Sequence, residues 1–178
     1  MESSITRSRL PKLTALVRDF RNSPIQSMWD LLAGLPGGKR LFSKAVGRAA
    51  PYSGSIGALV DELHDGFARL TLRDRPAIRQ HLGSVHAIAL ANLGELTTGL
   101  AMLYGFPEDA RGIVTSFKID YHKKARGLLT AQCTTEPITS SAEQEKELVA
   151  EIRDESGDLV ATATAAWLIR PKLRNGAT

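Results

Sequence analysis

Residues 82–106 form a mostly apolar stretch that a single acid interrupts. The segment reads LGSVHAIALANLGELTTGLAMLYGF, and Glu95 is its only carboxylate. A helix that is apolar around most of its circumference is a buried helix. The pattern therefore predicts a buried central helix with one carboxylate near its middle.

Alternating apolar and polar positions predict strands on both sides of this helix. One such segment, 68–73, precedes it, and 113–122 and 128–135 follow it. Segments 148–152 and 159–169 flank an ESGD turn and predict a hairpin. In the segment 113–122, one predicted face consists of Ile113, Thr115, Phe117, Ile119 and Tyr121. An antiparallel sheet buries one face, and one apolar helix is enough to cover it, so we expect an α+β fold with a curved sheet around the helix.

The N-terminal part of the chain has a helical pattern instead. Apolar residues three and four positions apart predict short amphipathic helices over 10–20, 25–33 and 41–48. The turn sequence GLPGGK separates the last two. The pattern changes at Pro51, after which we expect strands. No role for these helices follows from the pattern alone, although their amphipathic faces suit capping the sheet or covering the mouth of a pocket.

Length and composition favour one main domain. The chain has 178 residues, 43% of them hydrophobic, which is enough for one substantial core. We predict a helical extension over 1–50, a main domain over 51–172 and a C-terminal tail over 173–178. No window reaches 18 uninterrupted apolar residues and no apolar block begins the chain, so we expect neither a membrane span nor a secretory signal.

The cysteine and histidine content narrows the possible chemistry. Cys133 is the only cysteine, so an intrachain disulfide is excluded and a cytoplasmic location fits. Its alternation with Leu129 and Ala131 predicts a position in a strand core. The four histidines lack the spacings of zinc sites, so we expect no metal.

The net charge of +4 and the pI near 9.4 invite a nucleic-acid interpretation. The basic residues are spread along the chain, however, and only Lys123, Lys124 and Arg126 cluster tightly. Such a cluster suits the phosphates of a small molecule as well as a polymer backbone, and an ordinary solvated strand end explains it too. We expect no nucleic-acid partner.

The central acid is the first candidate for chemistry. Burial of an unpaired carboxylate raises its pKa toward neutrality, which suits a general base, whereas a structural ion pair is the plain alternative. On a helix Glu95 shares a small, polar face with Ala91, Asn92, Thr98 and Gly99. The other faces carry residues that read as core-filling, namely Ile88, Leu90, Leu93, Leu96, Leu100 and Leu103.

The segment HLGSVHAIALANLGELTTG resembles the signature of hotdog-fold thioesterases. In that superfamily a small loop and a histidine precede the central helix, and an acid follows nine positions later, as Glu95 follows His86. The segment DYHKKARGLLTAQ resembles the strand after the helix, and LPGGKRLFSKAVGRAAPYSGSIGA resembles a DUF4442-type subgroup related to PaaI-like thioesterases. The resemblance covers about residues 25–170 and implies the hotdog fold.

The resemblance also implies an activity, hydrolysis of an acyl thioester such as acyl-CoA. Glu95 takes the place of the family's base or nucleophile, and the backbone N–H of Ala87 that of the oxyanion donor. Gln80 or His86 would orient water. Asn92 and Thr98 are expected to line the substrate site, and the cluster Lys123, Lys124 and Arg126 is a candidate for the CoA phosphates.

The superfamily further implies a homodimer, possibly a tetramer, with the site across the subunit interface and no cofactor beyond the coenzyme A of the substrate.

The chain departs from the family pattern at two places: Ala87 and Ile88 stand where the family often has two glycines, and Gln80 stands where it often has asparagine. A non-catalytic acyl-thioester-binding protein therefore stays an alternative. So does a hydroxyacyl-thioester dehydratase, because His81 lies fourteen positions before Glu95, the spacing of its catalytic pair.

Overall fold

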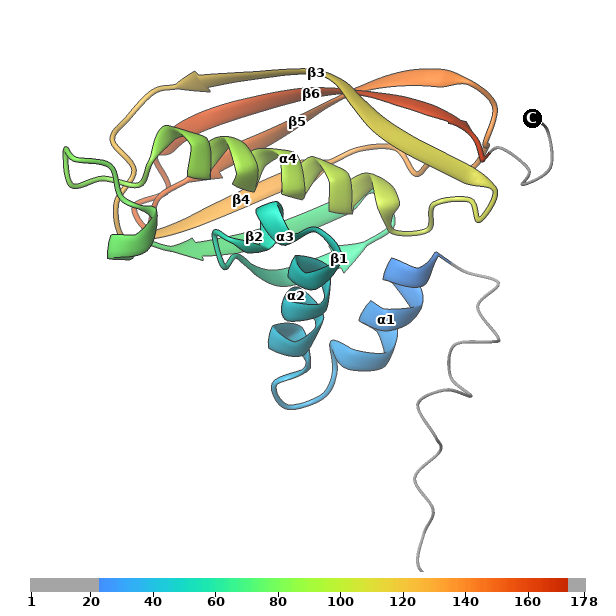
Figure 1. The fold of residues 1–178 in the computed structure, drawn as a ribbon, viewed down its shortest axis with the longest axis horizontal. Coiled ribbons are helices and arrows are strands. Elements are labelled where there is room, and N and C mark those ends of the chain that lie inside the picture. The colour runs from blue at the N-terminus through green and yellow to red at the C-terminus, as the bar shows by residue number, and fades with distance from the viewer. Residues whose placement is uncertain (1–22, 173–178) are drawn as a thin grey trace, which may run out of the picture.

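The structure, a computed structural model, describes residues 23–172. It consists of one antiparallel sheet, a central helix and a group of N-terminal helices (Figure 1). The helix predicted over 10–20 and the tail 173–178 lie outside the described residues. The helices are α1 (Pro24–Leu32), α2 (Gly38–Ala49), α3 (Pro51–Gly54), the 3₁₀ turn η1 (Pro76–Ile78) and α4 (Ala87–Leu103). The strands are β1 (Leu59–His64), β2 (Phe67–Arg73), β3 (Ala110–Tyr121), β4 (Leu128–Thr134), β5 (Gln144–Arg153) and β6 (Leu159–Pro171).

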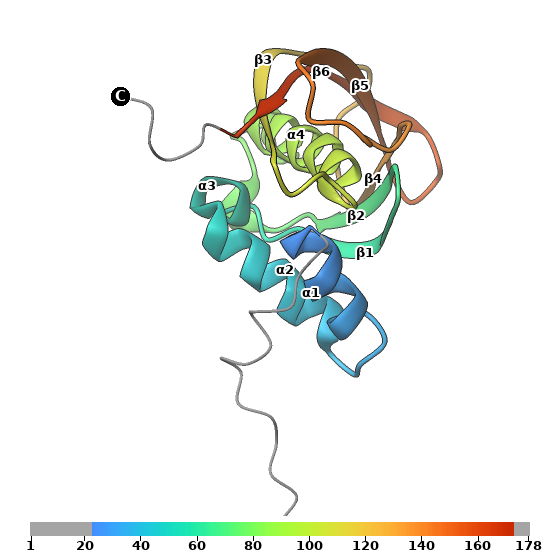
Figure 2. The same ribbon diagram turned by 90° about the vertical axis from the view of Figure 1, so that its right-hand side faces the viewer.

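The sheet has the strand order β1-β2-β4-β5-β6-β3, so β1 and β3 are its two edges. Every neighbouring pair is antiparallel. Figure 2, which looks along α4, shows the sheet curling around that helix. The sequence prediction of an α+β fold with a curved sheet wrapped around one helix is confirmed.

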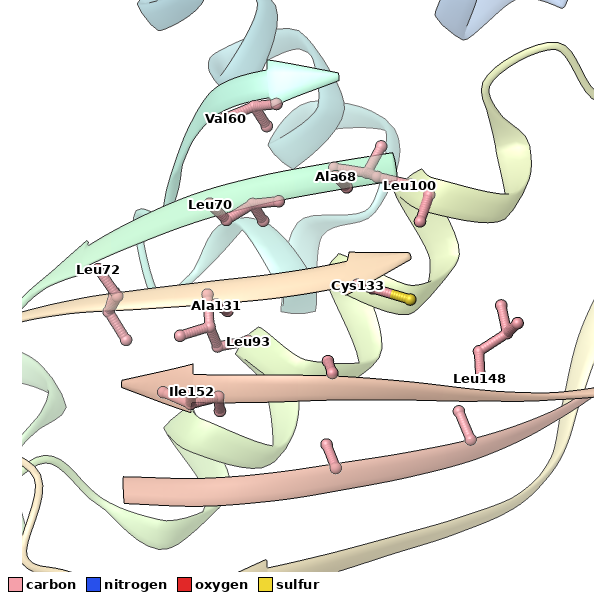
Figure 3. Close-up of a cluster of buried hydrophobic side chains, with 14 of the residues drawn as sticks. Val60, Ala68, Leu70, Leu72, Leu93, Leu100, Ala131, Cys133, Leu148 and Ile152 are labelled. Atoms are coloured by element: carbon pink, nitrogen blue, oxygen red, sulfur yellow. The ribbon is translucent and has the colours of Figure 1, made fainter. Parts of the chain in front are cut away.

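The core lies between α4 and the concave face of the sheet. Leu93 and Leu100 of α4 meet apolar side chains of β2, β4 and β5 (Figure 3). In β2 the predicted alternation is confirmed, because Ala68, Leu70 and Leu72 are all fully buried. A buried leucine contributes roughly 1.5–3 kcal/mol relative to leaving it exposed, so this layer is a main source of stability.

Strand β3 departs from its predicted face. Its register against β6 shifts between Val114 and Ser116, which is a β-bulge at Thr115. The bulge moves Val114 onto the partly buried face shared with Phe117, while Ile113 is 64% exposed. The prediction that Ile113 and Thr115 share the face of Phe117 is therefore wrong, because an extra residue reverses the alternation.

The N-terminal helices α1 and α2 match the predicted segments to within a few residues and pack against each other through Trp29 and Phe42, whose rings meet edge to face at 5.0 Å. They lie on the side of β1 in Figure 2. The segment after Pro51, where strands were expected, begins with the one-turn helix α3 before β1 follows. No helix within residues 23–172 is long and apolar enough to cross a membrane.

Candidate active site at the central helix

The first turn of α4 has a free backbone donor. His86 is the N-cap residue, and its Nδ1 accepts a hydrogen bond from the Ile88 backbone N–H at 3.1 Å. The backbone N–H of Ala87 has no hydrogen-bond acceptor within residues 23–172. The N-terminus of a helix carries a partial positive charge, so this donor is suited to a developing oxyanion.

Gln80 and Ala87 line the same cavity, which has a volume of about 310 Å³ and also touches Lys123 and Lys124. The Tyr121 hydroxyl donates to the Ala87 carbonyl at 3.0 Å, so β3 holds the first turn of α4. The Gln80 Nε2 donates to the Ser84 hydroxyl at 2.8 Å. The structure therefore brings the predicted oxyanion donor and the predicted water-orienting amide together.

The three predicted phosphate-binding residues have different surroundings. Lys123 Nζ forms ion pairs with Asp154 at 2.6 Å and with Asp158 at 2.5 Å, and these hydrogen bonds raise the pKa of Lys123. Lys124 and Arg126 are exposed and make no salt bridge within the described part of the chain. The charge of Lys123 is thus already balanced, which leaves two free cations of the predicted three.

Glu95 lies on α4 two turns beyond Ala87, on the wall of another cavity. This cavity has a volume of about 460 Å³ and is almost entirely apolar. The Glu95 carboxylate is partly buried and makes no hydrogen bond or ion pair within residues 23–172, and desolvation raises the pKa of that carboxyl. The structural ion pair that the sequence left open as an alternative therefore has no partner among these residues.

The walls of the Glu95 cavity come from five elements, α1, α2, α3, α4 and β6. Helix α1 contributes Ile25 and Met28, helix α2 contributes Val46, and Trp167 of β6 also borders it. The end of the cavity at Leu103 is fixed by the Ser23 hydroxyl, which donates to the Leu103 carbonyl at 2.8 Å. The sequence left covering the mouth of a pocket open as one role for these amphipathic helices, and α1 and α2 do line this cavity.

The remaining candidates on α4 fall into two groups. Asn92 lines a cavity of about 240 Å³ together with His86; its Nδ2 donates to the Tyr52 carbonyl at 3.0 Å, and its buried Oδ1 has no partner within residues 23–172. Thr98 is fully buried, donates to the Glu95 carbonyl at 2.9 Å and accepts from Trp167 Nε1 at 3.3 Å. The hydrogen bonds of Thr98 thus hold the helix against β6. The Asn92 Oδ1, in contrast, is a hydrogen-bond acceptor without a donor on the wall of the cavity.

One prediction about α4 is wrong. Ile88 was expected to fill the core, yet it is 52% exposed. It lies on the open side of the helix near Glu95 and Ala91, which are both partly exposed. The sheet covers only part of the helix surface, and this strip lies outside that part.

Within one chain, the predicted base and the predicted oxyanion donor are apart. Ala87 and Glu95 are eight positions apart on α4, which is about 12 Å along the axis, and they line different cavities. His81 is exposed in the turn before α4 and borders none of the four cavities described for residues 23–172. Both groups can contact the same thioester group only if a second subunit brings them together.

The chain matches the model of a known protein family. The model of the family described as a domain of unknown function, DUF4442, matches residues 38–169. A search of curated proteins by sequence finds no significant match.

Solved structures share the fold. The structure of the genomics target APC5556 is 26% identical, with a TM-score of 0.72, covering 83% of this chain and 99% of its own. PA5026 of Pseudomonas aeruginosa, described as a probable thioesterase, is 23% identical, with a TM-score of 0.66, over 78% of this chain and 97% of its own. Thioesterase HI1161 of Haemophilus influenzae is 15% identical, with a TM-score of 0.62, over 75% of this chain and 94% of its own. These similarities show the hotdog fold.

Proposed function

This chain belongs to the DUF4442 family, and we propose that it hydrolyses acyl thioesters of the acyl-CoA type, with Glu95 as the general base. The observation that carries the proposal is the unpaired Glu95 carboxylate on the wall of an apolar cavity. A raised pKa keeps a carboxyl group basic enough to accept a proton from water, and an apolar wall suits an acyl chain. The descriptions of PA5026 and HI1161 as thioesterases support the same reaction class.

The reaction would proceed in two steps. Glu95 accepts a proton from water as the water oxygen bonds to the thioester carbonyl carbon, and the backbone N–H of Ala87 donates to the resulting oxyanion. The carbon–sulfur bond then breaks, and the thiolate leaves with the proton that Glu95 held. The products are a carboxylic acid and the free thiol. Gln80 and Asn92 have amide groups that could hold the water or the pantetheine amide.

We propose that a second copy of the chain completes the site. Strand β3 is an edge strand of twelve residues, so its outer backbone groups have no strand partner within residues 23–172. Three large side chains near this edge and the open strip of α4 are exposed: Ile113, Tyr121 and Ile88. Pairing of two such edges would cover this apolar surface and could bring the Ala87 cavity of one copy toward Glu95 of the other. A homodimer is therefore part of the proposal.

The experiment measures hydrolysis of acyl-CoA substrates with acyl chains of two to sixteen carbons. The appearance of free thiol reports the rate. We expect turnover by the wild type and a loss of roughly 100-fold or more in Glu95→Gln. Glu147→Gln, a change of an exposed glutamate on β5, is the matched control and should leave the rate unchanged. Absence of turnover on every chain length, or full activity in Glu95→Gln, would contradict the proposal.

One observation favours a second function, binding of acyl thioesters without hydrolysis. Ala87 and Glu95 line separate cavities in the protomer, so a dimer that fails to join them would retain the apolar cavity but not the chemistry. Tight binding of an acyl-CoA that is never cleaved would support this alternative.

A further inference from the structure

A row of cations lies along α2, in the N-terminal part of the chain that precedes the sheet. Arg40, Lys44 and Arg48 are spaced four residues apart, so they share one face of the helix. All three line the largest of the cavities described for residues 23–172, which has a volume of about 610 Å³ between α2, α3 and β1. The spacing thus places three positive charges at one concave surface.

These three charges have no counterion in the protein. None of them makes a salt bridge or a side-chain hydrogen bond within residues 23–172, and no acidic residue lines the cavity. Strand β1 carries two acids: Glu62 is paired with Arg69, and Asp61 is partly buried and does not line the cavity. Like charges four positions apart repel each other along a helix. The row therefore leaves a positive potential in the cavity that an anion would neutralise.

The basic cavity adjoins the Glu95 cavity. Val46, Ser53 and Leu96 line both, and Leu96 directly follows Glu95 on α4. A ligand could therefore extend from the carboxylate across this shared wall to the cations of α2. One end of this combined surface is apolar and the other is positively charged, which matches a molecule with an acyl chain and a phosphorylated end.

We propose that the α2 cavity binds the phosphates of the acyl-CoA, through Arg40, Lys44 and Arg48. This inference rests on the proposed function for the identity of the substrate and adds the location of its phosphate site. Arginine and lysine form short, charge-assisted hydrogen bonds with phosphate oxygens, and the row rises about 12 Å along α2, so several phosphates can be contacted. The N-terminal helices thereby become part of the substrate site, and Lys123, held by Asp154 and Asp158, is not needed for it.

The test measures binding rather than turnover, with the full chain and two uncleavable probes. S-decyl-CoA carries the phosphates, and S-decyl-pantetheine has the same alkyl group and thioether without them. Titration calorimetry on the wild type should give at least tenfold tighter binding of S-decyl-CoA. The triple variant Arg40→Gln, Lys44→Gln, Arg48→Gln should lose that preference while its affinity for S-decyl-pantetheine changes less than about twofold.

Two sets of control variants make the result specific. Lys146→Gln, Arg153→Gln and Arg170→Gln remove the same total charge from β5 and β6, and should keep the preference for S-decyl-CoA. Lys124→Gln with Arg126→Gln tests the rival cluster after β3. The proposal is overturned if the wild type shows no preference for the phosphorylated probe, or if only the rival pair abolishes it.

Failure of the hydrolase proposal gives a different pattern. If the wild type binds S-decyl-CoA through the α2 cations but cleaves no thioester, the phosphate site holds and only the catalytic role of Glu95 falls. If acyl-CoA is cleaved with an unchanged KM in the triple α2 variant, the catalytic proposal holds and the phosphate site is wrong.

Discussion

Gly94 of α4 lies directly against Ala163 of β6: a Cβ atom added to Gly94 would stand 2.4 Å from the Cβ of Ala163. Carbon atoms cannot approach so closely, so the glycine lets the helix lie close to the sheet. Glu95 is the next residue, and its distance from the sheet and from the cavity wall depends on this contact.

Gly94→Ala should therefore destabilise the protein. Although alanine favours helix, the added methyl group forces α4 away from β6, and we expect a net loss of about 1–3 kcal/mol in the free energy of unfolding. Urea unfolding followed by circular dichroism measures it. Gly34→Ala, where a new Cβ meets nothing within 4 Å, is the control and should change stability by less than about 0.5 kcal/mol. An equally stable Gly94→Ala would mean that the close contact is not needed.

The central helix and most of the sheet could be predicted because their signals are local. An apolar stretch with one acid indicated α4, and alternation indicated β2, with Leu70 and Leu72 buried as expected. The bulge at Thr115 could not be predicted, because it arises from the pairing of β3 with β6 and its effect on Ile113 follows only from that pairing.

The candidate site was predictable only in part. Glu95 could be named as the one carboxylate of an apolar helix, and Gln80 and Ala87 could be named only through the resemblance to the hotdog thioesterase signature. The walls supplied by α1 and α2 could not, since the docking of two amphipathic helices onto a sheet edge depends on tertiary contacts such as that of Trp29 with Phe42. Whether two protomers join the Ala87 and Glu95 cavities stays a prediction.

Glu95→Gln should be more stable than the wild type near neutral pH. Burial raises the pKa of the Glu95 carboxyl in the folded protein above its value in the unfolded chain. The stability that the protonated carboxyl contributes is therefore fully present below the ordinary glutamate pKa, and it is lost as the pH rises through the raised pKa of the folded protein. The melting temperatures should therefore be similar at about pH 4, with the variant higher at about pH 7.5. Thermal unfolding across this range measures the difference. The opposite result would be a melting temperature of Glu95→Gln that falls below that of the wild type as the pH rises from acid to neutral. That result would show that a partner stabilises the charged carboxylate.

Cys133 should be unreactive in the folded protein. Its thiol is buried in β4, and burial raises the pKa of that thiol to about 11, so the thiolate is scarce at neutral pH. Iodoacetamide at about pH 8 should leave the native protein unmodified and should alkylate it once urea has unfolded it. Mass spectrometry counts the adduct. Rapid, stoichiometric labelling of the folded chain would place this cysteine at an accessible site instead.

Tyr121→Phe should slow catalysis with little effect on binding. The lost hydroxyl is the donor to the Ala87 carbonyl, so the first turn of α4 and its free N–H become less firmly positioned. We expect kcat to fall by about fivefold at a nearly constant KM. Tyr104→Phe, which removes a tyrosine hydrogen bond to Asp30 at the other end of α4, is the control for general loosening of the helix. An equal loss in both variants would argue against a specific role for Tyr121.

The most direct test of Glu95 as the base is the pH dependence of kcat/KM for a hydrolysed acyl-CoA. Since the unprotonated carboxylate is the active form, the wild-type value should rise with pH and level off above a midpoint higher than the ordinary glutamate pKa. In Glu95→Gln this rise should be absent, and the remaining rate should be at least roughly 100-fold below that of the wild type. A variant that keeps both the wild-type rate and the same rising limb would contradict the assignment of Glu95 as the general base.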